Sequence, residues 1–344
     1  MPDTKISPMP AAAYTNPIWN DDFPDPTIIR ASDGWYYAYG TQTKRHGAII
    51  NMQVARSADL VQWEYLGDAL PVKPDWASGT QKLWAPHVSE HAGRYYLYYS
   101  AKPDEAEVEG LCLAVATADE PAGPFTDIGA PLYCGPGFLN IDPMAFDDPA
   151  TGKRLLYWGS GFGPLMVREL AEDRISFAPD RETTILIQPA GAGDLKRYDQ
   201  LIEGSWVVLR DGWYYLFYSG NNCCGDDAHY GVLVARSRAA TGPFETLAEA
   251  TGNPYAMLLE GNQHWHAPGH NCVVTDSADQ DWLAYHAIDP EQPKFDAIDA
   301  DQGYSRRIML LDRLEYVGGW PRLVSGGTPS FKPQPAPVAH ENIS

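Results

Sequence analysis

The stretch LIEGSWVVLRDGWYYLFYSG, residues 201–220, indicates the architecture of the protein, because its layout returns four more times along the chain. It predicts an apolar strand, a tight turn at Asp211–Gly212 and a second strand rich in Tyr, Trp and Phe. The same layout is found at residues 25–41, 85–101, 142–160 and 269–287. The chain therefore contains five related units.

One position of the second strand shows that the units are of nearly equal length. Tyr36, Tyr95, Leu155, Tyr214 and Trp282 follow one another at intervals of 59, 60, 59 and 68 residues. A further strand follows in most units, as in INMQVARSADLVQWE and YGVLVARSRAATGPF. Units of three or four short strands cannot bury their own faces, and five of them can do so by packing radially around an axis.

The sequence therefore predicts an all-β protein, a five-bladed β-propeller. Residues 16–328 are expected to form a single domain, and no stretch between them has the composition of a linker. The ends at residues 1–15 and 329–344 are rich in proline and are expected to be extended tails.

Composition excludes several classes of partner. The chain has 344 residues, of which 44% are hydrophobic, and a formal net charge of −20. This charge repels nucleic-acid phosphate and anionic membrane surfaces, so neither is expected as a partner. The 20 Tyr, 11 Trp and 10 Phe suit a neutral ligand such as an oligosaccharide, bound by ring stacking, although most of these rings could instead be blade core.

The sequence also bears on the cellular location of the protein. Residues 1–20 carry no basic segment followed by an apolar one, and no window reaches the 18 apolar residues of a membrane span, so we expect a cytoplasmic protein. A secreted protein whose leader has been removed would read the same.

The cysteines predict neither a disulfide framework nor a zinc site. They are odd in number and show no Cys-x-x-Cys spacing. Cys223 and Cys224 are adjacent and could form a disulfide, but we expect them to be reduced and packed, like Cys112, Cys134 and Cys272.

Polar residues occupy one register of the first strand in each unit. The first strand of a propeller blade runs beside the central axis, so Asp25, Asp142, Glu203 and His270 should converge on one pocket. Carboxylates brought together between apolar walls repel one another and lose solvation, so catalysis or a bound cation has to offset that cost. His270 could hold a hydrated cation there, directly or through water.

Three further residues are candidates for contacting a sugar. Trp84 precedes the first strand of the second unit and could present its ring, or it could pack at a blade edge. Phe23 could wall the pocket or belong to the core. His87 could reach into the pocket or cap its strand.

The motifs together resemble glycoside hydrolase family 43, five-bladed propeller hydrolases that act on arabinose- and xylose-containing polysaccharides. The resemblance spans residues 16–324 and rests on the order and spacing of DFPDPTII, SADLVQWE, LWAP, NIDPMAFDD, IEG, PGHN, YHA and RIMLLDRLEY. Each motif is short, and the set in this order is specific.

The resemblance implies roles for five residues. Asp25 matches the general base, Glu203 the general acid, and Asp142 the carboxylate that tunes and orients the acid. Arg307 resembles the arginine that steadies this Asp and contacts sugar, and His270 resembles a channel histidine associated with a calcium ion. No organic cofactor is implied, and the mechanism would be inverting.

The chemistry of the residues agrees with this reading. Glycoside hydrolysis needs one protonated and one ionised carboxyl group, with room for water beside the base of an inverting enzyme. Repulsion from Asp142 would keep Glu203 protonated near neutral pH, while Asp25, nearer solvent, would stay ionised. Two departures from the family pattern are His87, where an acidic residue is usual, and Ser205, where Pro is frequent.

We therefore expect an inverting glycosidase that releases L-arabinose from arabinan-type or arabinosyl-substituted oligosaccharides. We expect no sandwich domain after the propeller, and the Cys223–Cys224 pair resembles the arabinan-degrading branch. A β-D-xylosidase or an endo-α-1,5-L-arabinanase of the same fold is the alternative. A sugar-binding propeller lectin is a non-enzymatic alternative, but it would not need the three carboxylates. In a scaffold stabilised by a cation, the carboxylates would serve only to bind the metal.

Overall fold

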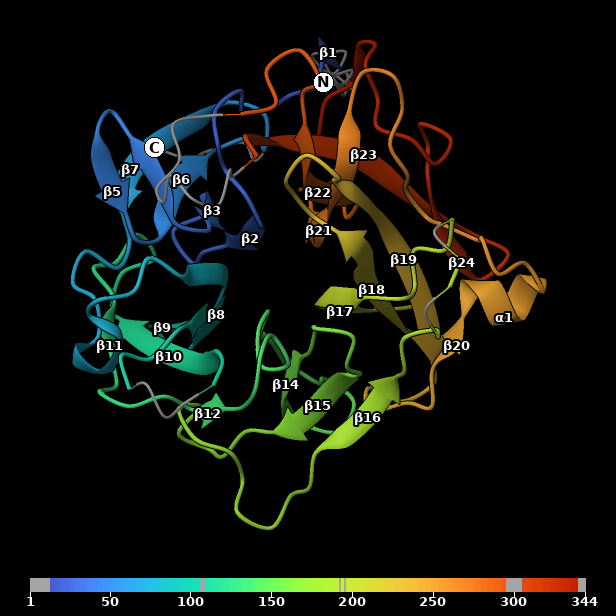
Figure 1. Cartoon of the computed structure of the whole chain (residues 1–344). Helices are drawn as coiled ribbons and strands as arrows, with labels where there is room; N and C mark the ends of the chain where they lie inside the picture. The colour runs from blue at the N-terminus through green and yellow to red at the C-terminus, as the bar shows by residue number, and fades with distance from the viewer. Residues whose placement is uncertain (1–12, 106–108, 192, 195, 295–304, 340–344) are drawn as a thin grey trace, which may run out of the picture.

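The protein is a five-bladed β-propeller (Figure 1). The computed structural model describes residues 13–105, 109–191, 193–194, 196–294 and 305–339. Blades 1 and 2 consist of β2 (Thr27–Arg30), β3 (Tyr36–Gly40), β6 (Gln53–Ser57) and β7 (Trp63–Asp68), then β8 (Leu83–His91), β9 (Arg94–Ala101), β10 (Cys112–Ala118), β11 (Thr126–Asp127) and β12 (Tyr133–Cys134). Blades 3 to 5 consist of β13 (Met144–Asp147), β14 (Arg154–Trp158), β15 (Leu165–Glu169) and β16 (Thr184–Ile187), then β17 (Ile202–Arg210), β18 (Trp213–Asn222), β19 (His229–Ser237) and β20 (Glu245–Thr246), then β21 (His266–Thr275), β22 (Asp281–Ile288), β23 (Arg307–Val317) and β24 (Trp320–Leu323).

Each blade is an antiparallel meander whose strands follow chain order, as in β17-β18-β19-β20. The repeated hairpin of the sequence joins the first two strands. Between β17 and β18 the turn residues Asp211 and Gly212 have φ of 49° and 72°, the left-handed pair that a two-residue type I′ turn requires. The predicted fold class and the hairpin at 201–220 are confirmed.

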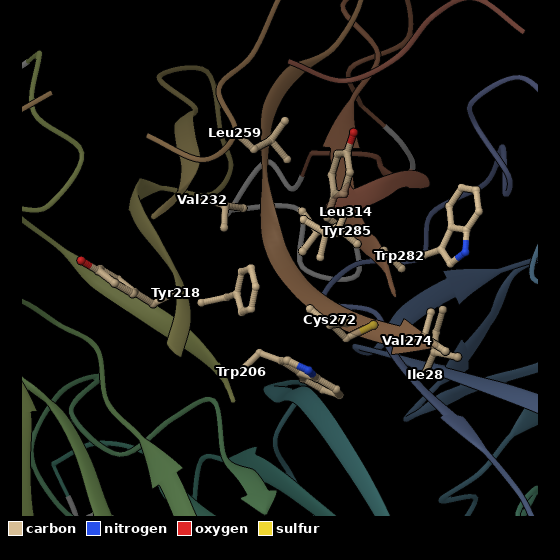
Figure 2. Packing of buried hydrophobic residues seen from close by; sticks show 14 of the residues in the cluster. Ile28, Trp206, Tyr218, Val232, Leu259, Cys272, Val274, Trp282, Tyr285 and Leu314 are labelled. Atoms are coloured by element: carbon tan, nitrogen blue, oxygen red, sulfur yellow. The ribbon is translucent and has the colours of Figure 1, made fainter. Parts of the chain in front are cut away.

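The core lies between the blades and is filled by the aromatic second strands. Tyr36, Tyr98, Tyr157, Tyr218 and Tyr285 are all less than 2% exposed. One cluster continues from blade 4 through blade 5 to blade 1, and Figure 2 shows Trp206, Tyr285 and Ile28 within it. Most of the rings on these strands are therefore blade core.

The two ends of the chain meet on blade 5. β1 (Ala13–Tyr14) pairs with β25 (Gln334–Pro335), and the Tyr14 hydroxyl donates to the backbone oxygen of Leu311 at 2.6 Å. Extended tails were predicted at both ends, and here Tyr14 is buried and anchors its extended segment to the blade. Residues 1–12 and 340–344 lie outside the described residues.

Two disulfides correct the expectation of reduced cysteines. β12 folds back onto β10 and places Cys134 opposite Cys112, with a Cα separation of 4.1 Å, and the two are bonded. Cys223 and Cys224 are bonded to each other, and Cys272 is free and buried. Spacing alone could not reveal the first pair, because it depends on a strand pairing within blade 2.

Only short elements lie outside the blades in the described part of the chain. Besides the β1–β25 pair, they are the hairpin β4 (Thr43–Arg45) and β5 (Ala48–Ile50), the 3-10 turn at Asp75–Ala77 and the helix α1 (Leu247–Thr251). Thr246 and Glu249 cap α1 reciprocally, and Gly252 ends it in the left-handed conformation. Within the described ranges, neither helix is long and apolar enough to cross a membrane.

Candidate active site

The same backbone kink occurs at the inner strand of every blade. The residues with positive φ at this register are Asp25, Ala85, Asp142, Gly204 and His270, at 54°, 49°, 60°, 64° and 47°. Four of the five are not glycine, and each of these carries a conformational cost that the surrounding structure must hold in place. The kink is accompanied by a register shift in the ladders of blades 2, 4 and 5.

The kinked ends line one pocket at the mouth of the central channel. The pocket has a volume of about 690 Å³, and its lining includes Asp25, Asp142, Glu203, His270 and Arg307. The structure thus brings together the three carboxylates, the histidine and the arginine that the sequence singled out from four different blades. A volume of this size is typical of a small-molecule site.

The walls of the pocket are aromatic. Trp84 lines it and stacks on Phe138, with ring centroids 6.1 Å apart and an interplanar angle of 14°. Phe162 lines it from a neighbouring loop and is 69% exposed. Neither phenylalanine was among the residues predicted from the sequence. Each lies in a glycine-rich loop, GPGFL or SGFGP, and a large apolar residue outside any strand is a signal that could have identified them.

The Cys223–Cys224 disulfide also lines the pocket, from the loop that follows β18. Cys223 packs against the small apolar cluster that contains Tyr230 and Ile288. The pair therefore contributes a compact apolar surface to the wall, opposite in character to the carboxylates.

Asp25 is an ionised carboxylate in a buried position. Arg307 Nη1 donates to its Oδ1 at 3.0 Å, and the Thr41 hydroxyl donates to its Oδ2 at 2.5 Å. Burial alone would raise the pKa of Asp25, but Arg307, then His270 and His286, outweigh it and hold the pKa well below its usual value. Asp25 is 6% exposed, so the expectation that it lies nearer solvent is wrong, and its charge is maintained by partners rather than by water.

Arg307 is paired differently from the expectation. Its guanidinium forms its ion pair with Asp25, and its backbone N–H donates to Asp22 Oδ1 at 2.9 Å. The resemblance implied that it would steady Asp142; no hydrogen bond between the two is found among the described residues, but the Arg307 charge acts on Asp142 from a distance and lowers its pKa in part. The reason is position, because β23 follows β22 outward in blade 5 and its first residue lies beside blade 1, whereas Asp142 belongs to blade 3.

Asp142 and Glu203 form the second carboxylate group of the site. Asp142 Oδ2 accepts the backbone N–H of Gly204 at 3.1 Å. Burial raises the pKa of Asp142 well above its ordinary range, and repulsion from Glu203 and then Asp25 adds to the rise. The pKa of Asp142 is therefore shifted in the direction that keeps a proton on this pair of carboxyl groups, which is the direction that a general acid requires.

Glu203 has a hydroxyl donor on each oxygen. Tyr230 donates to Oε1 at 2.7 Å and Ser160 donates to Oε2 at 2.5 Å. The sequence prediction placed the retained proton on Glu203, whereas the structure shows the raised pKa at Asp142. The two hydroxyls fix the orientation of the Glu203 carboxyl group from both of its oxygens.

Two predicted sugar contacts lie outside the pocket. Phe23 is fully buried and packs against Trp19, so it belongs to the core. His87 is 6% exposed and packs against Trp206 and Tyr98 below the pocket floor. Burial lowers the pKa of His87 to about 4, so it is a neutral side chain of the channel wall and neither a sugar contact nor an exposed strand cap.

Known proteins resemble this chain in both sequence and fold. Residues 14–321 match glycosyl hydrolases family 43. The chain belongs to glycoside hydrolase family 43.

Three relatives illustrate the similarity. The extracellular exo-α-(1→5)-L-arabinofuranosidase ArbA of Cellvibrio japonicus is 28% identical, over 88% of this chain and 86% of that protein. The extracellular endo-α-(1→5)-L-arabinanase 1 of Bacillus subtilis is 27% identical, over 92% of each. The structure of an α-L-arabinanase of Cellvibrio cellulosa complexed with arabinohexaose superposes with a TM-score of 0.70 at 26% identity, covering 88% of this chain and 96% of that one.

The channel of this family 43 chain was also expected to hold a cation at His270. Across the described ranges, no group of three or more His, Cys, Asp or Glu side chains is placed to hold a metal ion. His270 Nδ1 is 3.4 Å from Asp25 Oδ1, but that oxygen is already committed to Arg307. A calcium ion bound directly by six to eight protein oxygens therefore does not fit.

A hydrated ion or water does fit below His270. Polar atoms without a hydrogen-bond partner line the narrow space there, on Thr27, His87, Ser205 and Asn271. Buried polar atoms of this kind are normally satisfied by water, and a hydrated ion would present the same water oxygens and protons to them. Such an ion would supply positive charge beneath the carboxylates.

Proposed function

We propose that this family 43 glycoside hydrolase is an exo-acting α-L-arabinofuranosidase that releases L-arabinose from arabino-oligosaccharides with inversion of configuration. The observation that carries the proposal is the electrostatic division of the pocket. Asp25 is held ionised by Arg307, while the pair formed by Asp142 and Glu203 retains a proton. One ionised and one protonated carboxyl group facing a sugar pocket is the arrangement that glycoside hydrolysis uses.

The reaction follows from these two states. Asp25 accepts a proton from a water molecule, whose oxygen attacks the anomeric carbon on the face opposite the leaving group. The bond from the anomeric carbon to the glycosidic oxygen breaks, and Glu203 delivers the proton of the pair to that oxygen. The sugar leaves with the opposite anomeric configuration, Asp25 protonated and Glu203 ionised, and proton exchange with water restores both.

The pocket walls support a sugar substrate. Trp84 offers an indole face steadied by its stacking on Phe138, and Phe162 and the Cys223–Cys224 disulfide add apolar surface. Apolar surface of this kind packs against the C–H faces of a sugar, while the carboxylates accept hydrogen bonds from its hydroxyls. The choice of arabinose draws on the relatives, which include arabinan-active enzymes matched over nearly their full length.

One experiment tests substrate and mode of cleavage together. The protein would be incubated with aryl α-L-arabinofuranoside, aryl β-D-xyloside and linear arabinan, and the products followed with time. We expect release of arabinose from the first and from arabinan, with few intermediate oligomers. Early mixed oligomers from arabinan would show endo action, and cleavage of the xyloside alone would overturn the choice of arabinose.

The variant Asp25→Ala serves as the control for catalysis, because its loss should abolish activity on every substrate. Sugar binding without cleavage by the unmodified protein would indicate a lectin. Exhaustive chelation followed by assay separates a channel cation that only supports the scaffold from one needed for turnover.

A further inference from the structure

A ring of hydrogen bonds joins each blade to the next at the pocket floor. In each blade, one polar side chain at the end of the second strand or just after it lies near the inner-strand kink, and these residues are Thr41, Ser100, Ser160, Ser219 and His286. In blades 2, 4 and 5 it pairs with the residue directly before the kink. At four of the five junctions that side chain accepts the backbone N–H of the kinked residue in the following blade. The junctions are Thr41 to Ala85 at 2.7 Å, Ser100 to Asp142 at 3.0 Å, Ser219 to His270 at 2.7 Å and His286 to Asp25 at 3.1 Å.

The junction between blades 3 and 4 breaks the pattern. The kinked residue there is Gly204, and its N–H donates to the Asp142 carboxylate instead of to Ser160. Ser160 is thereby relieved of the backbone contact that its equivalents make. Its hydroxyl donates to Glu203 Oε2 at 2.5 Å, one residue before the kink.

Tyr230 completes the arrangement from β19. Its hydroxyl donates to Glu203 Oε1 at 2.7 Å, and it is 1% exposed. Its ring stacks on His286, with centroids 5.7 Å apart, and a methyl group at Gly269 would overlap the ring. Tyr230 is therefore held rigidly, and its hydroxyl has a fixed direction.

We propose that Ser160 and Tyr230 are positioning residues for proton transfer by Glu203, and that the Ser160 hydroxyl serves this purpose because Asp142 accepts the Gly204 N–H in its place. The inference rests on the proposed function, because it takes Glu203 as the general acid. The two hydroxyls hold the carboxyl plane toward the leaving group. They also stabilise the carboxylate that remains once the proton has left, since hydrogen bonds to a charged acceptor are stronger than those to a neutral one.

The proposal predicts a loss that depends on the leaving group. Dinitrophenolate can leave without being protonated, whereas the sugar oxygen that leaves from arabinobiose must receive a proton as its bond breaks. Ser160→Ala should lower kcat on arabinobiose about tenfold to hundredfold, the range for a hydrogen bond to a charged group, with KM little changed. On dinitrophenyl α-L-arabinofuranoside the same variant should lose less than about threefold, because the transferred proton no longer contributes.

Matched variants separate positioning from simple packing. Ser219→Ala removes a hydroxyl at the same register of the next blade, whose bond goes to the His270 backbone. It should affect both substrates equally. Ser160→Thr keeps a hydroxyl and should recover much of the loss on arabinobiose. If Ser160→Ala does not fold, as judged by circular dichroism, Tyr230→Phe takes its place with the same expectation.

Glu203→Ala in the same series tells the two possible failures apart. If Glu203→Ala loses much more on arabinobiose than on the dinitrophenyl substrate and Ser160→Ala loses equally on both, the acid assignment stands and the positioning proposal is overturned. If Glu203→Ala itself loses equally on both substrates, the acid assignment fails and the positioning proposal fails with it. If Ser160→Ala, Tyr230→Phe and Glu203→Ala each lose more activity on arabinobiose than on the dinitrophenyl substrate, the proposal is supported.

Discussion

Replacing Arg307 by glutamine tests the electrostatic division of the site most directly. The guanidinium lies 3.0 Å from Asp25 Oδ1, and the two side chains are only 10% and 8% exposed. The substitution leaves a buried carboxylate without its nearest full positive charge. Thr41, His270 and His286 remain in contact with it, so the loss is partial.

The magnitude follows from the pairing of carboxylates with arginine. An adjacent Arg lowers the pKa of an Asp by about 1 to 3 units, so the Arg307→Gln variant should protonate Asp25 at a pH about 1 to 3 units higher. Because a general base must be ionised, the acidic limb of the kcat/KM profile should move upward by the same amount. Breaking a buried pair should also cost about 3 to 5 kcal/mol of stability at neutral pH.

The sign of the stability effect can be checked against pH. Asp25 has a depressed pKa in the folded state, so it contributes stability above its unfolded pKa of about 3.9, and this contribution is lost as the pH falls toward the folded value. The gap in melting temperature between the native protein and the variant should therefore be widest near neutral pH and narrow below about pH 4.

Arg306→Gln is the matched control. Arg306 is the preceding residue, is 9% exposed, and donates to Asn20 rather than to a carboxylate. It should lose stability without moving the acidic limb. An unmoved acidic limb in Arg307→Gln, or equal shifts in both variants, would refute the assignment of Arg307 as the group that keeps Asp25 ionised.

Three further predictions follow from the same geometry. Asp142→Asn should keep the fold, lower kcat and move the alkaline limb of the pH–rate profile, because the carboxyl group with which Glu203 shares a proton is removed; an unchanged profile would exclude this role. Phe162→Ala should raise KM for arabino-oligosaccharides about tenfold with little change in melting temperature, since the ring is 69% exposed and contributes to the pocket rather than the core; an unchanged KM would place substrate elsewhere. Gly204→Ala should lower stability by about 1 to 2 kcal/mol in denaturant titrations, because φ is 64° there and the new methyl would lie 3.4 Å from the His270 ring; a neutral effect would mean that the kink relaxes.

Much of the architecture could be read from the chain because its determinants are local and repeated. A hairpin needs only alternating apolar residues and a turn such as Asp211–Gly212, and five copies at nearly equal spacing leave radial packing as the way to bury their faces. The register of the repeats also predicted that Asp25, Asp142, Glu203 and His270 would lie together, because equivalent positions of a propeller converge on its axis. All four line the pocket.

The repeat pattern of the chain therefore predicts the fold and the carboxylates that lie together in the pocket. The hydrogen-bond partners of these groups depend instead on how the blades pack against one another. Arg307 forms its ion pair with Asp25, Asp142 accepts the Gly204 N–H, and the Ser160 hydroxyl donates to Glu203. Each of these outcomes is a competition among donors and acceptors from different blades, and distances of a few tenths of an ångström decide it. A repeat pattern specifies position along a strand, but it does not specify which of several nearby acceptors a donor will reach.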